Sequence, residues 1–129
     1  MKGLMSVSSS SPSHSVIVTR LRAVGCVFAE DEARLLISAA ATDGDLTAMV
    51  DRRVAGEPLE HVLGWVAFRG LRIAVEPGVF VPRRRTEFLV DQAAALAGPR
   101  ALVVDLCCGS GAVGAALLAT LDRVQLHAV

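Results

Sequence analysis

The stretch Ala101–Gly114, Ala-Leu-Val-Val-Asp-Leu-Cys-Cys-Gly-Ser-Gly-Ala-Val-Gly, combines three features that together predict an α/β fold. It opens with a short Val-rich apolar run that ends at Asp105, as is typical of a buried parallel strand. Small residues fill the loop over 107–111, and the Ala- and Leu-rich segment 112–121 then predicts a helix. This order presents backbone N–H groups and a helix N-terminus to a polar ligand.

Composition limits the classes of function. The chain has 129 residues and 53% hydrophobic content, which is enough for one small core. Its net charge of zero gives no indication of a general polyanion-binding surface, so we expect no direct nucleic-acid partner. The three cysteines are Cys26, Cys107 and Cys108. Their odd number and spacing favour neither disulfides nor a metal site, in agreement with a reducing cytoplasm.

No membrane segment is expected. The apolar run 101–118 contains Asp105 and several glycines, which disfavour a spanning helix. The serine-rich residues 1–15 lack an apolar core of signal-peptide length, and we expect them to be a disordered tail. A cytoplasmic location follows from both expectations.

Helical patterns precede the hairpin pattern. The apolar spacing predicts helices over 16–24, 30–41, 46–55 and 59–63. The third helix is expected to follow a turn at Asp43-Gly44-Asp45, with Asp45 as its N-cap. Two short apolar runs, 65–68 and 71–75, surround Arg69-Gly70 and predict a β-hairpin.

The remaining elements lead to and from the glycine loop. Thr86 is a candidate N-cap for a helix over 87–96, and a second strand is expected over 124–129. The expected organisation is therefore a tail (1–15), a small helical domain (16–63), a β-hairpin linker (64–85) and the start of an α/β domain (86–129).

The glycine loop has three interpretations. Gly109–Gly114 fits Gly-x-Gly-x-x-Gly, the dinucleotide fingerprint, which also requires an acidic residue about 20 positions on. The sequence ends 15 residues after Gly114, so this requirement is not testable. A loop without a ligand is the second interpretation.

The third interpretation begins at Asp105. The spacing Asp-x-x-x-Gly-x-Gly after a strand resembles the first motif of class I S-adenosylmethionine methyltransferases. Asp105 would hold the loop by accepting its N–H groups, or would receive the ammonium of the ligand. Residues 105–108 separate the strand from the glycines, which favours this interpretation over a dinucleotide loop. The candidate cofactor-binding residues are Asp105, Cys107, Cys108, Gly109, Ser110 and Gly111.

Motifs upstream of the loop carry a more specific resemblance. They are Gly56-Glu57-Pro58 within the segment 53–64, Phe68-Arg69-Gly70, the segment 75–83 that ends in Val-Pro-Arg, and Thr86-Glu87. In this combined spacing the chain, over about 21–129, resembles the protein-glutamine N-methyltransferase family, which includes the release factor glutamine methyltransferases.

The resemblance implies a fold and an activity. The second domain would begin a Rossmann-like class I methyltransferase sheet, with S-adenosylmethionine bound over 107–111. The reaction would transfer a methyl group to the side-chain amide nitrogen of a glutamine in a protein. That protein would be a peptide chain release factor or a ribosomal protein, and the helical domain would recognise it.

The chain departs from the family pattern at four positions. Arg84 and Arg85 replace the proline and acidic residue of Pro-Arg-Pro-acid-Thr-Glu, Cys107 replaces the first loop glycine, and His61 replaces a tyrosine. These departures suggest a paralogous branch with a different substrate. The run Arg83–Arg85 could contact a phosphate or ribosomal RNA. We expect Arg84 and Arg85 to be solvated instead, and Arg83 to support the cofactor site.

The Asn-Pro-Pro-Tyr motif of the family does not occur in the sequence. An amide nitrogen is a poor nucleophile and must be held in position for attack. We therefore assign no catalytic residue, and expect a truncated, inactive chain that binds S-adenosylmethionine weakly or not at all. A dinucleotide-binding oxidoreductase fragment and a non-catalytic binding remnant are the alternatives.

Overall fold

A computed structural model describes residues 11–129 and divides the chain into two compact units between Leu63 and Gly64. Residues 1–10 of the expected tail (1–15) lie outside the described residues. Its remaining part is shorter than expected, because helix α1 (His14–Ala23) already begins at His14. Ser13 precedes this helix with an extended backbone, but its side chain makes no capping hydrogen bond.

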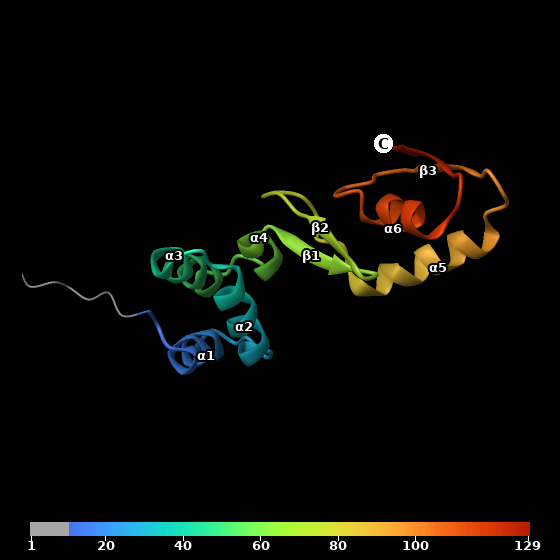
Figure 1. Ribbon diagram of the computed structural model, residues 1–129. Helices are drawn as coiled ribbons and strands as arrows, with labels where there is room; N and C mark the ends of the chain where they lie inside the picture. The colour runs from blue at the N-terminus through green and yellow to red at the C-terminus, as the bar shows by residue number, and fades with distance from the viewer. Residues whose placement is uncertain (1–10) are drawn as a thin grey trace, which may run out of the picture. The chain divides into compact units, whose positions relative to one another are not determined.

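The first unit is helical, and its helices are the blue to green elements of Figure 1. After α1 come α2 (Ala29–Ala39), α3 (Asp43–Val54) and the short α4 (Leu59–Leu63). Each helix turns one apolar face inward, and together these faces form a single core. The buried side chains are Ile17, Val18, Leu21, Ala29, Ala33, Leu36, Leu46, Val50 and Val62.

Helix α3 begins earlier than the sequence pattern predicts. Thr42 is its N-cap, and the Thr42 hydroxyl accepts a hydrogen bond of 3.1 Å from the backbone N–H of Asp45. The predictions of a turn at 43–45 and of a cap at Asp45 are therefore wrong. Once Thr42 satisfies this N–H group, Asp43 and Asp45 lie in the first turn, where the helix dipole favours acidic side chains.

The second unit opens with the hairpin of strands β1 (Trp65–Phe68) and β2 (Leu71–Ala74). Both residues between the strands have positive φ, 46° at Arg69 and 75° at Gly70, as a type I′ turn requires. Phe68 and Ile73 are buried, whereas Arg72 lies on the exposed face with its guanidinium carbon 3.9 Å from the ring centroid of Trp65. The predicted hairpin is confirmed.

A 3₁₀ turn, η1 (Arg84–Thr86), leads directly into helix α5 (Glu87–Leu96). The predicted helix is confirmed, but the prediction of Thr86 as its N-cap is wrong. Thr86 already has helical backbone angles because it belongs to the 3₁₀ turn, and its hydroxyl makes no capping bond.

The last elements alternate strand, helix and strand, which confirms a mixed α/β structure. Strand β3 (Leu102–Asp105) pairs in parallel with β4 (Gln125–Ala128), and α6 (Ala112–Thr120) connects them. The prediction of a buried strand is wrong for one face of β3, because Leu102 and Val104 are 65% and 52% exposed. Helix α6 packs against α5, as Figure 1 shows. The buried residues of this core are Phe68, Ile73, Val90, Ala112, Ala116 and Leu117.

Gly114 on α6 allows this helix to lie close to β4. A Cβ at Gly114 would be 2.6 Å from Leu126 Cδ2, which is closer than real Cβ atoms come to a neighbour. The glycine is therefore required by packing rather than by its backbone angles. None of the described helices is both long and apolar enough to cross a membrane.

Candidate functional site

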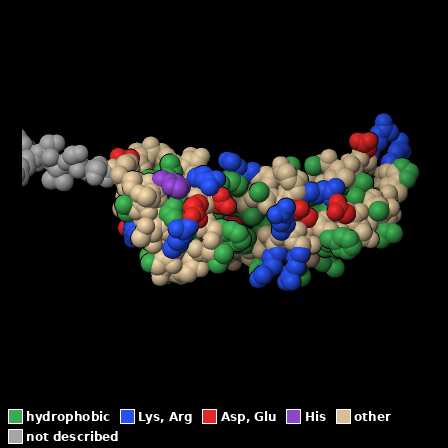
Figure 2. Space-filling model, turned by 90° about the horizontal axis from the view of Figure 1, so that it is seen from below, with side chains coloured by type: hydrophobic (Ala, Val, Ile, Leu, Met, Phe, Trp, Pro, Cys, Tyr) green, Lys and Arg blue, Asp and Glu red, His purple; other side chains and the backbone are tan. Residues whose placement is uncertain are grey.

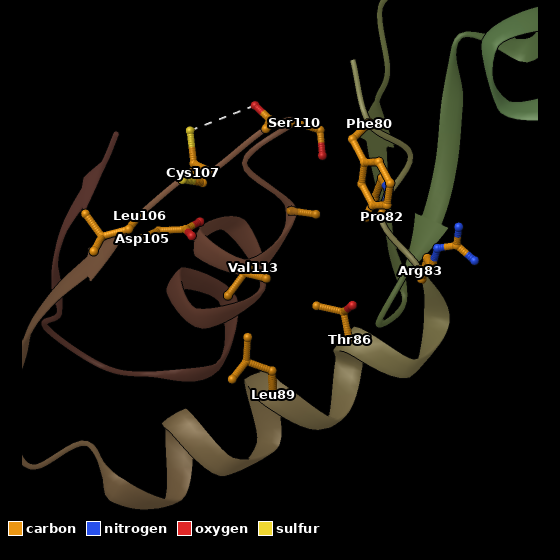
Figure 3. Close-up of a pocket in the computed structure, with 13 residues that line it drawn as sticks. Phe80, Pro82, Arg83, Thr86, Leu89, Asp105, Leu106, Cys107, Ser110 and Val113 are labelled. Atoms are coloured by element: carbon orange, nitrogen blue, oxygen red, sulfur yellow. Dashed lines mark hydrogen bonds between the residues drawn. The ribbon is translucent and has the colours of Figure 1, made fainter. Parts of the chain in front are cut away.

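A cavity of about 340 Å³ opens in the second unit where β3 ends. The glycine loop and the start of α6 form one wall, and the segment around η1 forms the opposite wall (Figure 3). Five of the six predicted cofactor-binding residues line it, namely Asp105, Cys107, Cys108, Gly109 and Ser110. The sixth, Gly111, lies outside the lining and is the N-cap of α6.

The loop is bent by three residues with positive φ: Cys107 at 57°, Gly109 at 54° and Gly111 at 77°. Its shape is fixed by a hydrogen bond of 2.8 Å from the Gly111 N–H to the Cys108 carbonyl oxygen. The Cys108 N–H in turn donates to the carbonyl oxygen of Val129 at 3.0 Å. Small side chains and tight bends leave the loop backbone accessible from the cavity.

Asp105 is the acidic group of the cavity. Its Oδ2 atom is buried and has no hydrogen-bond partner among the described residues. This oxygen therefore does not hold the loop through N–H groups, which was one of the two roles expected for Asp105. A buried carboxylate oxygen without a donor favours a cationic or hydrogen-bonding ligand beside it.

The opposite wall includes Arg83, which was expected to support the cofactor site, but its other residues were not predicted from the sequence. Phe80 and Pro82 come from the segment before η1, whereas Thr86 and Leu89 come from η1 and α5. In Figure 3, Thr86 and Leu89 point toward α6, and the Arg83 side chain points away from the glycine loop. These side chains lie in or beside the Val-Pro-Arg and Thr-Glu motifs, so the motifs could have indicated that this segment forms part of the site.

A second, more apolar cavity of about 260 Å³ adjoins the first. Leu89, Asp105, Leu106 and Val113 line both cavities. The second cavity continues along α5 and β3 past Ala93, Val103, Val104 and Leu117. Asp105 thus lies where the two cavities meet.

Other candidate chemistry is less well supported. All three cysteines are free, and Cys107 is exposed while Cys26 and Cys108 are partly buried. No group of three or more potential metal ligands occurs within residues 11–129. Burial raises the pKa of the Cys26 thiol above its ordinary value of 9.0, and the Glu32 carboxylate acts in the same direction.

Comparisons with known proteins give a consistent result. No family model matches the chain. A release factor glutamine methyltransferase of Streptomyces coelicolor is 46% identical over 85 residues, which are 63% of this chain and 30% of the relative. The enzyme of the same name from Bifidobacterium longum is 36% identical over 126 residues, covering 92% of this chain and 43% of the relative. A Corynebacterium glutamicum relative of that name is 45% identical over 85 residues, 64% of this chain and 30% of its own length.

The chain belongs to the release factor glutamine methyltransferase family. It spans less than half the length of these relatives, at most 43% of the three compared. The resemblance carried by the sequence motifs is thereby confirmed.

The structure shows where the residues that depart from the family pattern lie. Cys107, at a position where the family has glycine, adopts a left-handed backbone that glycine accepts without strain. Arg84 and Arg85 are exposed on η1, immediately beside the cavity wall. The Glu57 carboxylate of the Gly56-Glu57-Pro58 motif accepts hydrogen bonds from Arg52 Nε at 3.1 Å and from Arg52 Nη2 at 2.7 Å.

Proposed function

We propose that the second unit binds S-adenosylmethionine in the cavity between the glycine loop and η1. The buried, unpartnered Asp105 Oδ2 is the observation that carries the proposal. A carboxylate there suits the ammonium group of the methionyl part, because a charge-assisted hydrogen bond would satisfy the isolated oxygen. The names of the relatives support the same cofactor.

The loop residues fit such a ligand. Cys107, Gly109 and Ser110 have small side chains and line the cavity, so backbone groups can approach the ligand closely. Thr86 and Leu89 close the other side and would exclude water from the bound molecule. When bound, S-adenosylmethionine would supply an electrophilic methyl group carried by its sulfonium.

The activity we propose for the whole protein is methylation of a glutamine side-chain amide in a protein substrate. The substrate class is a peptide chain release factor or a ribosomal protein, and the helical unit would recognise it. The names of the relatives support a release factor as the substrate. The β3–α6–β4 segment would belong to a Rossmann-like sheet, and the location would be cytoplasmic. No catalytic group is assigned among the described residues.

Ligand-observed NMR on the full chain tests the cofactor, because this method detects weak binding. S-adenosylmethionine and NAD are compared as ligands, with Asp105→Asn as the site variant. Asp122→Asn is the matched control, since Asp122 is an exposed aspartate outside the cavity.

We expect saturation transfer to S-adenosylmethionine, weakened about 10-fold or more by Asp105→Asn and unchanged by Asp122→Asn. Stronger binding of NAD than of S-adenosylmethionine would favour the dinucleotide interpretation of the loop. Equal binding by wild type and Asp105→Asn would refute the role of Asp105.

A further inference from the structure

The run Arg83-Arg84-Arg85 is exposed at the point where η1 leads into α5. None of these three guanidinium groups lies within ion-pair distance of a carboxylate in residues 11–129; the six ion pairs there use other arginines. Arg83 instead lies over the ring of Phe80, with its guanidinium carbon 5.7 Å from the ring centroid. Three cationic groups are therefore available to an anionic partner.

Their place in the fold is electrostatically unfavourable. The N-terminal end of a helix carries partial positive charge, so cations there destabilise it. Arg84 and Arg85 lie in the 3₁₀ turn immediately before α5, next to those N–H groups. Glu87, in the first turn of α5, offsets part of this effect while it also accepts the backbone N–H of Arg69 at 2.8 Å. Asp91 is paired with Arg69, with 2.6 Å between Oδ1 and Nη1. Two adjacent cations at the start of a helix still break a local rule, and such exceptions are expected at functional sites.

Two aromatic rings are exposed beside the arginines. Phe80 is 68% exposed, and Phe88 is 67% exposed. Phe88 lies three residues after Arg85 and four after Arg84, so these side chains share one side of the helical segment. Figure 2 shows basic side chains standing out from the surface with hydrophobic side chains beside them.

The zero net charge of the chain conceals an uneven distribution. Residues 64–129 contain seven arginines and five carboxylates, whereas residues 1–63 contain six basic and eight acidic side chains. The second unit is therefore positive, and nearly half of its arginines belong to one run. The absence of a general polyanion surface, inferred from net charge, does not extend to this segment.

We propose that Arg83, Arg84 and Arg85, with Phe80 and Phe88, form a binding surface for single-stranded RNA. Guanidinium groups match phosphate oxygens in a bidentate geometry. Exposed aromatic rings stack on unpaired bases, which a duplex does not offer. An acidic protein segment would use the arginines but would leave both rings in water, so RNA fits the whole surface better. Phe80 and Arg83 also line the cavity in which we propose that the cofactor binds, whereas Arg84, Arg85 and Phe88 lie outside its lining and test the RNA surface separately.

Fluorescence anisotropy of the full chain with a labelled single-stranded RNA of about 12 nucleotides tests this proposal. The site variant is Arg84→Gln/Arg85→Gln. The matched control is Arg100→Gln/Arg123→Gln, which removes the same charge from two exposed arginines elsewhere in the second unit. Far-UV circular dichroism checks that each variant is folded.

We expect the site variant to lower the slope of log K against log salt by about 1.4, because each lost phosphate contact contributes about 0.7. Phe88→Ala should weaken binding about fivefold or more with the salt slope unchanged. Equal losses in the site variant and in the control, no RNA binding by the wild type, or displacement of the RNA by an equimolar poly-glutamate peptide would each overturn the proposal.

Discussion

The Glu87 side chain accepts a hydrogen bond from the backbone N–H of Arg69, with 2.8 Å between Oε1 and N. Arg69 lies in the tight turn of the hairpin, and Glu87 is the first residue of α5. The bond therefore fastens the hairpin to the helix that forms one wall of the cavity. Its partly buried position makes it worth more than a bond in water.

Glu87→Ala should lower the free energy of unfolding by roughly 1.5 kcal/mol, because the Arg69 N–H loses a charged acceptor. Urea denaturation followed by circular dichroism measures the change. Asp122→Ala is the control: Asp122 is exposed and forms no ion pair among the described residues, so its loss should cost less than about 0.5 kcal/mol. Equal effects would contradict the importance of the Glu87 bond.

Gly114→Ala should destabilise the second unit by about 1 kcal/mol. The new Cβ would lie 2.6 Å from Leu126 Cδ2, and moving Leu126 away would cost about 1–3 kcal/mol. The higher helix propensity of alanine would recover part of this lost stability. A double-mutant cycle with Leu126→Ala measures the coupling. The alanine at 114 should cost nothing once Leu126 is shortened, and an additive cycle would refute the contact.

Cys107→Gly should raise the free energy of unfolding by about 0.5–1 kcal/mol. The left-handed backbone at Cys107, with φ of 57°, costs a residue with a side chain about 1–2 kcal/mol, partly offset by the greater freedom of glycine when unfolded. Cys108→Gly is the matched control and should be destabilising, since Cys108 is absent from the positions with positive φ. Chemical denaturation of both variants gives the comparison, and stabilisation by Cys108→Gly alone would reverse the argument.

Among the ion pairs of residues 11–63, Arg53–Glu32 has the least exposed side chains, at 21% and 13%. Arg53→Met should cost about 2–3 kcal/mol, because it leaves the Glu32 carboxylate without its partner in a poorly solvated place. Arg52→Met, in an exposed pair, should cost less than about 1 kcal/mol. Thermal denaturation of both variants measures the difference in stability between Arg53→Met and Arg52→Met. Adding Glu32→Gln should recover part of the first loss, and a further loss would contradict this account.

The hydrogen bond from Arg52 lowers the pKa of Glu57 below its ordinary value of 4.5. The folded-state pKa is thus below the unfolded-state value, so the stabilisation is present above pH 4.5 and is lost as the pH falls through the folded-state pKa. An NMR titration of the carboxyl carbons should place Glu57 below its ordinary range, and Arg52→Met should return it. Arg34→Met, which removes a different ion pair, should leave the titration of Glu57 unchanged.

Local sequence signals were sufficient for most elements. Alternating apolar residues around Arg69-Gly70 fixed the hairpin, because both central turn residues must accept positive φ and glycine does so readily. Helix α5 followed from an apolar run that ends at Gly98-Pro99, and the two strands β3 and β4 followed from short apolar runs. Caps were harder, since Thr42 and Asp45 are both good N-cap residues and only the backbone path decides between them.

The sequence by itself determined the candidate loop. Asp105 and the glycines after it are neighbours in the chain, so their spacing alone indicated a ligand-binding turn. Only the tertiary structure decided what faces that loop. Phe80, Thr86 and Leu89 reach the loop because α5 packs against α6. The Asp105 Oδ2 atom is buried against α6 beside Gly114, where no donor meets it. Such contacts join residues far apart in the chain, and they depend on shape and burial, which no local pattern encodes.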